Sequence, residues 1–424
     1  MYLIYILNFI ILILLIVLLP VIIAALALKP KFRAGFWQKL CCYKKLPKSP
    51  EAKHIVIHAV SVGEVIAVEK FIKVLRDNFP TDKIILTTVT KTGNTVANQK
   101  LSNIVDEIIY FPFDLFFAVK SFVKNIKPDI VIIAETEIWP FFALELKNHK
   151  IPVIIINGRI SPNSHNGYKK FRWFFKHVLS CYTKILMQTS GDMQRIIDVG
   201  ANPKITEIMG NLKFDIEKNL SSKEIENLKS QFQSEGKPVF IAGSTHKGED
   251  EIVLKAYKKL CQKVPKTKLI LAPRHPERLK DVENLLKTEG FLYGKRSQGS
   301  NFEDNQVILL DTMGELSKLY AISNVAFIGG SFSGTGGHNP LEAAIYDIPV
   351  ISGPSTFNFK DIYKFLTDYK ASFIVNDENE LSEKLEKLFT DNDFYSQTSQ
   401  SCGKVFVENS GAIENAIKAI KEIL

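Results

Sequence analysis

Several features that mark other classes of protein are scarce or missing in this chain of 424 residues. Its five cysteines are scattered and odd in number, so they match neither a metal site nor a disulfide framework, and they fit a reducing compartment. No dense tract of lysine and arginine accompanies the net charge of +9. We therefore expect no nucleic-acid partner, no metal ion and no other cofactor.

A dinucleotide-binding fingerprint is missing as well. Glycines gather at 329–337, but they lack the spacing of a glycine-rich turn between a strand and a helix. The sequence therefore argues against an enzyme that uses a nicotinamide cofactor.

Charge is missing from residues 1–28, which are almost entirely apolar. This run is long enough to span a hydrocarbon core of ~30 Å, and no basic region precedes it as in a cleavable signal peptide. We therefore expect a single-pass membrane anchor at 1–28. The next segment, 29–50, is basic and aromatic, which predicts contact with the bilayer surface and places the rest of the chain on the cytoplasmic side. The basic residues that precede the first acidic residue are Lys29, Lys31, Arg33, Lys39, Lys44, Lys45 and Lys48.

The rest of the chain is an alternation of apolar, strand-like runs and helical patterns, which predicts parallel sheets covered by helices on both faces. Single cores rarely grow past roughly 250–300 residues, so the length predicts two domains. We expect an α/β protein with a Rossmann-like domain at 51–215, a linker at 216–237 and a second Rossmann-like domain at 238–424. The runs lie at 55–60, 83–88, 107–111, 129–134, 153–156 and 184–188, and then at 238–242, 268–272, 306–310, 324–328, 349–351 and 372–375.

A single carboxylate follows the first of these runs. Residues 55–60 are typical of a buried strand, and a helical pattern begins at about residue 65, so Glu64 falls where the strand gives way to the helix. Ligands of α/β proteins bind at this edge of the sheet, and a helix N-terminus favours a charged carboxylate. Taken alone, Glu64 fits two roles, a residue that starts the helix and a catalytic base.

Polar residues also follow later strands of the first half. Glu135 and Glu137 come directly after the run 129–134, and in an extended segment they share a face. The stretch GNLKFD places Lys213 at the junction of the two predicted domains, where it fits a catalytic cation as well as a surface ion pair.

The second half repeats this layout with groups suited to a phosphate. Residues 243–245 are candidate donors to a phosphate at a helix N-terminus, while Glu249–Glu251 fit the first turn of that helix. Arg274 and His275 follow the next strand, and a guanidinium matches the geometry of phosphate oxygens.

Two further stretches have chemistry suited to a nucleotide. The first, 311–316, offers backbone amides beside a glycine. In the second, Asn339 and Pro340 fit an N-cap and the first residue of a helix, and Glu342 can accept hydrogen bonds from ribose hydroxyls. His338, considered alone, fits a structural role.

Nine stretches in this order resemble the Kdo transferases of lipopolysaccharide synthesis, where Kdo is 3-deoxy-D-manno-octulosonic acid. The resemblance implies a GT-B fold, in which two Rossmann-like domains face each other across a cleft, with an anchor helix in the bacterial inner membrane. The stretches are HAVSVGEV, AETEIWP, NGRIS, GNLKFD, AGSTHKGEDE, APRHPER, DTMGEL, GGHNPLEAA and GPSTFNFKD.

The resemblance also implies an inverting transfer of Kdo from CMP-Kdo to the 6′-hydroxyl of lipid IVA, a step of lipid A synthesis. Glu64 is then the expected general base, and Glu135 and Lys213 are the expected stabilisers of the transition state. The acceptor is expected in the first domain and CMP-Kdo in the second. The residues expected to bind CMP are Arg274, His275, Met313, Gly314, Glu315, Leu316, Asn339, Pro340, Leu341 and Glu342.

Two main alternatives stay open. A glycosyltransferase or epimerase of the same fold could use another nucleotide sugar, which competition between CMP and UDP would reveal. A non-catalytic, membrane-tethered sugar-nucleotide sensor is the other, although the presence of candidate base and cation residues argues against it.

Overall fold

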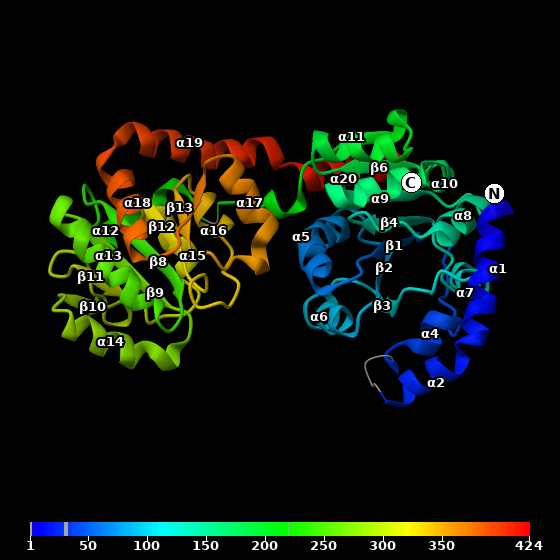
Figure 1. Ribbon diagram of the computed structural model, residues 1–424, viewed down its shortest axis with the longest axis horizontal. Helices are drawn as coiled ribbons and strands as arrows, with labels where there is room; N and C mark the ends of the chain where they lie inside the picture. The colour runs from blue at the N-terminus through cyan, green and yellow to red at the C-terminus, as the bar shows by residue number, and fades with distance from the viewer. Residues whose placement is uncertain (1, 29–32, 219) are drawn as a thin grey trace. The chain divides into compact units, whose positions relative to one another are not determined.

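The computed structural model describes residues 2–28, 33–218 and 220–424 (Figure 1). The chain divides into two compact units, one made of Met1–Asp215 with Asn409–Leu424 and the other of Ile216–Glu408. Each unit is built on one sheet of seven strands. All neighbouring strands pair in parallel, as the alternating sequence pattern predicts.

The sheet of the first unit has the strand order β3-β2-β1-β4-β5-β6-β7. Strands β1 and β4 are buried along their whole length, because helices cover both faces, and this burial explains their largely apolar sequences. The strands are β1 (His54–His58), β2 (Lys83–Thr88), β3 (Glu107–Tyr110), β4 (Ile130–Ala134), β5 (Val153–Gly158), β6 (Lys184–Met187) and β7 (Thr206–Ile208).

Helices form a separate core on each face of this sheet. Side chains of α5, α6 and α20 fill one core, and side chains of α7, α8, α10 and α11 fill the other. The elements are α5 (Val62–Asn78), α6 (Lys91–Leu101), α7 (Phe116–Ile126), α8 (Pro140–Asn148), α9 (Pro162–Lys170), α10 (Arg172–Leu179), α11 (Ser190–Val199), α20 (Ala412–Lys421) and the short 3₁₀ turns η1 (Pro203–Ile205) and η2 (Leu212–Phe214).

The sheet of the second unit has the order β10-β11-β9-β8-β12-β13-β14. Helices α13, α14 and α18 pack apolar side chains onto it. The strands are β8 (Val239–Thr245), β9 (Lys268–Pro273), β10 (Tyr293–Lys295), β11 (Val307–Leu309), β12 (Val325–Ile328), β13 (Val350–Ser352) and β14 (Ser372–Ile374). The helices are α12 (Ser222–Phe232), α13 (Glu249–Lys263), α14 (Leu279–Thr288), α15 (Leu316–Leu319), α16 (Leu341–Ala344), α17 (Lys360–Asp368), α18 (Glu378–Thr390) and α19 (Asn392–Asn409), with 3₁₀ turns η3 (Pro276–Arg278), η4 (Arg296–Gln298), η5 (Tyr320–Ile322) and η6 (Phe357–Phe359).

Two edge strands, β7 and β10, are not predicted by the sequence pattern. Each has only three residues, and most of those residues are partly or fully exposed. Because an edge strand of this length needs no run of apolar side chains, it leaves little signal in the sequence.

The end of the chain belongs to the first unit, so the assignment of 409–424 to the second domain is wrong. The apolar face of α20, which includes Ile413 and Ile420, is buried in a core of the first sheet, and Figure 1 shows α20 (red) next to α5. The carboxylate of Asp215 accepts the backbone N–H groups of Gly411 and Ile413, which fixes the start of the helix. The predicted linker 216–237 forms part of the second unit and contains α12.

The apolar N-terminus forms two helices, α1 (Tyr2–Val17) and α2 (Leu19–Leu28), followed by α4 (Phe36–Leu40). Among the described residues, no single helix is long and apolar enough to span a membrane, although the pair Ile11–Val17 and Leu19–Leu28, bent by 62°, meets that test together. The break lies beside Pro20, whose ring and missing N–H disfavour a continuous helix. Lys29 and Lys31 of the predicted basic segment lie outside the described residues.

An asparagine attaches α1 to the rest of the first unit. Asn8 donates from Nδ2 to the Asp114 carbonyl at 3.1 Å and accepts the Phe116 N–H at 3.2 Å. This buried amide is the polar exception in an otherwise apolar helix.

Candidate active site

The strand order of the first unit reverses between β1 and β4, which pair at the middle of the sheet. Ligands of α/β sheets bind beside such a point, at the carboxyl ends of the strands. Glu64 follows β1 and Glu135 follows β4. The structure therefore brings the two predicted catalytic carboxylates to neighbouring strand ends.

Glu64 lies in the first turn of α5, directly after the loop that leaves β1. Its Oε2 accepts the Val60 N–H at 2.7 Å, and its Oε1 accepts the Ser61 hydroxyl at 3.1 Å. The residue is only 9% exposed. Its carboxylate is therefore held by the loop just before it.

Burial raises the pKa of Glu64 to about 7. The Val60 and Ser61 hydrogen bonds oppose this shift, while the negative charges of Glu135 and Glu137 add to it. Burial also raises the pKa of Glu137, again with a contribution from Glu135. A carboxyl group with a pKa near neutrality can accept a proton at physiological pH, as a general base must.

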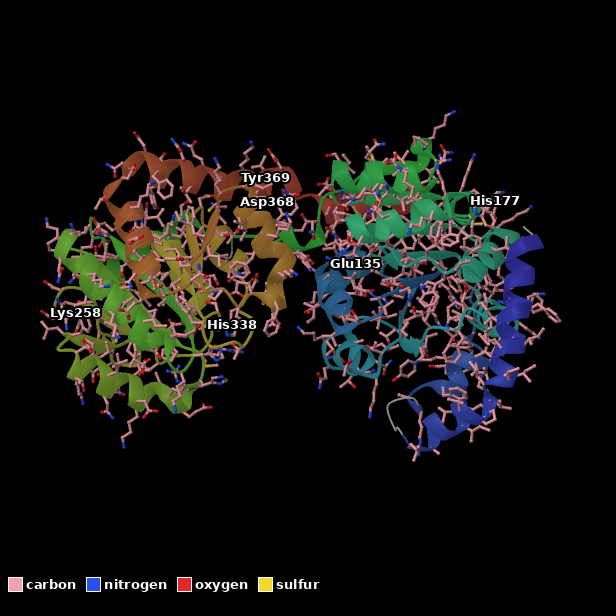
Figure 2. The ribbon with its side chains drawn as sticks, viewed as in Figure 1. Glu135, His177, Lys258, His338, Asp368 and Tyr369 are labelled. Atoms are coloured by element: carbon pink, nitrogen blue, oxygen red, sulfur yellow. The ribbon has the colours of Figure 1, made fainter. Side chains whose placement is uncertain are left out.

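Glu135 occupies an uncommon backbone conformation, with φ at +59°. Its N–H donates to the Ile156 carbonyl at 2.9 Å, and its Oε2 accepts a bond from Arg159 Nε at 3.0 Å. Thr136 adds a second link, since its hydroxyl accepts the Arg159 N–H at 2.8 Å. The loops after β4 and β5 thus hold Glu135 (labelled in Figure 2) in one orientation. The sequence alone did not predict the role of Arg159 in this contact.

Lys213 lies in η2, after the edge strand β7. The Asn157 side chain, at the end of β5, accepts the Leu212 N–H at 3.1 Å and so connects η2 with the central strands. Lys213 is half-buried. Among the residues that the structure describes, its ammonium group has no hydrogen bond or ion pair, which leaves it free for an anionic group.

The strand order of the second unit reverses between β8 and β12. The predicted CMP-binding residues all lie in loops or helix starts that follow β9, β11 and β12. Arg274 is exposed, and its N–H donates to the Thr245 carbonyl at 2.9 Å. The exposed ring of His275 lies edge-on to His246, with ring centroids 5.2 Å apart. Both side chains are accessible to a ligand.

Thr245, one of the predicted phosphate donors, is buried. Its hydroxyl donates to Asp250 at 2.6 Å, and Arg278 pairs with the same carboxylate. The hydroxyl proton is therefore already used in a hydrogen bond inside the protein, and the prediction that it binds phosphate is wrong.

In the stretch after β11, some residues are exposed and others are engaged in contacts within the protein. Met313 is 74% exposed, and Gly314 has φ at +81°. The Glu315 carboxylate accepts a hydrogen bond from Thr312 and pairs with Arg296 at 3.1 Å, just before Leu316 begins α15. The Glu315 side chain is thus engaged, so this stretch can meet a ligand through its backbone and Met313.

The stretch after β12 ends at α16. Asn339 accepts the Leu341 N–H at 3.1 Å, and α16 begins at Leu341, one residue later than predicted, with Pro340 before it. Burial raises the pKa of Glu342, although a hydrogen bond with Asn339 and the charge of Arg274 oppose the shift. Arg274 and Glu342 therefore lie close enough to interact across two strand ends.

A histidine pair joins the loops after β8 and β12. The Nε2 atoms of His246 and His338 lie 2.9 Å apart, so one ring donates to the other. Burial, together with the nearby His246 and Arg274, lowers the pKa of His338 (labelled in Figure 2) to about 4. The sequence did not predict this pair because its members are 92 residues apart.

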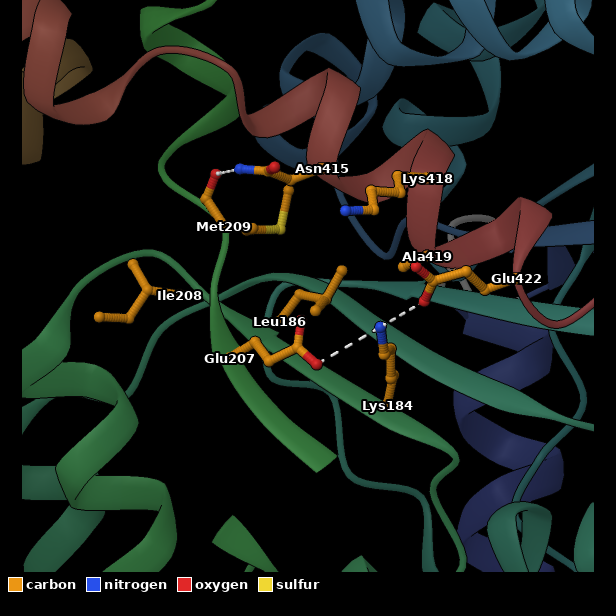
Figure 3. Close-up of a pocket in the computed structure, with 9 residues that line it drawn as sticks. All are labelled: Lys184, Leu186, Glu207, Ile208, Met209, Asn415, Lys418, Ala419 and Glu422. Atoms are coloured by element: carbon orange, nitrogen blue, oxygen red, sulfur yellow. Dashed lines mark hydrogen bonds and ion pairs between the residues drawn. The ribbon is translucent and has the colours of Figure 1, made fainter. Parts of the chain in front are cut away.

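Two hollows lie in the first unit, and none of the predicted site residues lines either of them. A polar hollow of about 370 Å³ lies between β6, β7 and α20, where Lys184 pairs with Glu207 and Glu422 (Figure 3). An apolar hollow of about 900 Å³ is lined by α1, α2, α4 and the segment 113–117. The second hollow has the character of a site for hydrocarbon.

Comparison with known proteins identifies the family. A family model for 3-deoxy-D-manno-octulosonic acid transferases matches residues 34–216, and a model for group 1 glycosyl transferases matches residues 225–404. The 3-deoxy-D-manno-octulosonic acid transferase of Haemophilus influenzae is 35% identical over 395 residues, which cover 92% of this chain and 90% of that protein. This chain belongs to the Kdo transferase family. The Kdo transferase of Rickettsia bellii is 31% identical over 80% of each chain.

A solved structure agrees with this architecture. The UDP-GlcNAc 2-epimerase of Neisseria meningitidis matches 87% of this Kdo transferase family member and 99% of its own chain, with 16% identity and a TM-score of 0.52. At this identity the likeness concerns the fold alone. Two Rossmann-like units and this likeness together show the GT-B fold of a glycosyltransferase.

Proposed function

We propose that the protein transfers Kdo from CMP-Kdo to the 6′-hydroxyl of lipid IVA, with inversion at the sugar carbon. The observation that carries the proposal is Glu64, a buried carboxyl group at the carboxyl end of a central strand whose pKa is raised to about 7. Transfer to a hydroxyl needs a base that can take its proton. The names of the relatives support Kdo as the sugar.

In this scheme ionised Glu64 takes the proton of the acceptor hydroxyl while the hydroxyl oxygen forms a bond to C2 of Kdo. The bond between C2 and the phosphate oxygen breaks, and its electron pair leaves with CMP. A positioned general base typically contributes about 10²–10⁴-fold to the rate. Glu135 stabilises the transition state, and Lys213 and Arg274 offset the charge that develops on the departing phosphate. The scheme requires no metal ion.

The apolar hollow supports a lipid acceptor. Its lining includes Leu15 and Ile23 from the N-terminal helices and the aromatic residues Phe36 and Trp37. A basic residue lies close by, since Lys39 is in α4 between Trp37 and Leu40, which line the hollow. Apolar surface beside cations fits an amphiphile with acyl chains and phosphates. We accordingly propose that the N-terminal helices anchor the protein at the cytoplasmic face of the inner membrane.

Product analysis tests the reaction. The unmodified protein, incubated with CMP-Kdo and lipid IVA, should give a lipid whose mass increases by one or more Kdo residues. Glu64→Ala should lose this product while it still folds and binds CMP. The matched control is Glu69→Ala, in the same helix, where Glu69 forms surface ion pairs with Lys73 and Lys100. Near-full transfer by Glu64→Ala would refute the assignment of the base.

Competition between nucleotides tests the donor. CMP should inhibit transfer and UDP should not, because the proposed leaving group is CMP. Inhibition by UDP alone would favour another nucleotide sugar, as used by other proteins of this fold.

A further inference from the structure

Glu249 is the first residue of α13, and its side chain is fully buried. Its carboxylate accepts four backbone N–H groups. Oε2 accepts those of His246 at 2.8 Å and Gly330 at 2.7 Å. Oε1 accepts those of Ser331 at 2.8 Å and Phe332 at 2.7 Å. Both oxygens are therefore fully engaged with main chain.

These donors come from the two loops that flank the point where the strand order reverses. His246 lies in the loop after β8, and the other three lie 81 to 83 residues after Glu249, in the loop after β12. A buried carboxylate is costly unless it is hydrogen-bonded, and bonds to a charged acceptor are stronger than neutral ones. Glu249 thus joins the two loops at the position where α/β sheets bind ligands.

The loop after β12 is held by other hydrogen bonds as well, because the Ser355 N–H donates to the Ser331 carbonyl at 2.9 Å and Asn358 Nδ2 donates to the Thr335 carbonyl at 2.8 Å. Gly330 has φ at +72°, and a Cβ atom at Gly329 would lie 2.4 Å from the Ser244 carbonyl oxygen. The start of this loop therefore lies too close to the end of β8 for a side chain between them. The loop also folds back on itself, since Gly337 N–H donates to the Gly330 carbonyl at 2.8 Å. An anchor at 330–332 therefore also fixes where the loop ends, at His338 and Asn339.

We propose that Glu249 is a positioning residue for the donor, whose carboxylate sets the 329–337 loop and thereby presents His338 and Asn339–Glu342 to the nucleotide. This inference rests on the proposed function, in which the second unit binds CMP-Kdo. The bond between His246 and His338 links the same two loops a second time. Glu249 does not touch the donor but acts through the loop.

Glu249→Gln tests the role with little change in volume. A glutamine has one carbonyl oxygen, and its NH₂ group would face N–H donors that need an acceptor. We expect the affinity for CMP, measured by isothermal titration calorimetry, to fall at least tenfold and the KM for CMP-Kdo to rise similarly. The KM for lipid IVA should stay unchanged. A merely structural role would lower the melting temperature without this selective loss.

The matched control is Glu145→Gln. Glu145 is also a buried carboxylate, but it lies in α8 of the first unit, where it contacts His149 at 3.3 Å. This control should keep the CMP affinity of the unmodified protein. Glu249→Gln with unchanged CMP affinity would overturn the proposal.

Hydrogen exchange of the unmodified protein gives a readout that needs no variant and no substrate. The amides of His246, Gly330, Ser331 and Phe332 should exchange slowly, although they lie outside helices and strands. Exchange at the rate of an open loop would overturn the proposal. If the unmodified protein binds no CMP although these amides are protected, the proposed donor is wrong and the anchoring of the loop still stands.

Discussion

Glu64 and Glu249 occupy corresponding places in the two units, because each follows the first strand of its unit, where the strand order reverses, and lies at the start of the next helix. Their hydrogen bonds differ. Glu64 accepts two bonds, both from the loop just before it, and has acidic neighbours. Glu249 accepts four bonds from two loops. The same topological position thus holds the proposed base in one unit and a carboxylate that joins two loops in the other.

The difference follows from how the charge is compensated. Hydrogen bonds to a carboxylate stabilise its charged form, whereas burial and nearby negative charges destabilise it. For Glu64 the second set of effects prevails, so its pKa is raised to about 7. A group that exchanges a proton near neutral pH is suited to catalysis, and a fully bonded one is suited to holding a loop.

The largest expected effect is kinetic, and it separates the role of Glu64 from that of Glu249. Glu64→Gln should lower kcat by about 10²–10⁴-fold, as for the loss of a general base, with little change in CMP affinity. Glu249→Gln should instead act mainly through the KM for CMP-Kdo. Steady-state kinetics of both variants, with both substrates varied, measure this split. If both variants changed the same parameter, the two carboxylates would not have distinct roles.

The next largest effect tests the assignment of α20 to the first unit. Ile420 of α20 is fully buried in a core of the first sheet. Ile420→Ala should therefore destabilise the first unit by about 2–5 kcal/mol, the usual cost of such a truncation. Trp37, Trp139 and Trp173 are the three tryptophans of the chain and all lie in the first unit, so fluorescence during urea unfolding reports on that unit.

Lys421→Ala is the matched control, because Lys421 lies in the same helix and is exposed. It should leave the unfolding curve nearly unchanged. A fluorescence transition that is the same in Ile420→Ala as in the unmodified protein would contradict the placement of α20 in the first unit.

Much of this comparison could be predicted from the sequence. The apolar run before Glu64 and the helical pattern after it place that residue at a strand end, and parallel pairing brings the strand ends together. For the same reason the sequence places Glu135 at a strand end, although it does not predict that this strand, β4, pairs with β1. These features depend on residues that are close in sequence.

The remaining features depend on distant partners, and the sequence does not predict them. Glu249 fits the first turn of a helix, but its donors at 330–332 lie more than 80 residues away. The apolar face of α20 predicts a buried helix without indicating which sheet it covers. Asp215, whose carboxylate accepts the Gly411 N–H just before α20, is 196 residues away from Gly411 in the sequence.

A smaller effect concerns stability. Below pH 7 the folded protein keeps a proton on Glu64 that the unfolded chain loses near the ordinary glutamate pKa of 4.5. Raising the pH from about 4.5 to about 7 therefore removes stability through this group, and the loss is complete above that range. Glu64→Gln should then be more stable than the unmodified protein at pH 8 by about 1–3 kcal/mol, with no such gain at pH 4.5. Urea unfolding at the two pH values measures the difference. Equal stability of the variant and the unmodified protein at pH 8 would show that ionisation of Glu64 does not destabilise the fold.

The smallest expected effect is a shift in the pH profile. Because Glu64 must be ionised to act as a base, kcat/KM should fall about tenfold per pH unit below its pKa of about 7. Glu137→Gln removes one of the negative charges that raise this pKa, so the acidic limb should move to lower pH. Glu137 contributes less than Glu135 to the shift, so the displacement should be modest, and the rate at pH 8 should be unaffected because Glu64 is ionised there in both proteins. An acidic limb that stays in place would show that the titrating group lies beyond the influence of Glu137 and is therefore not Glu64.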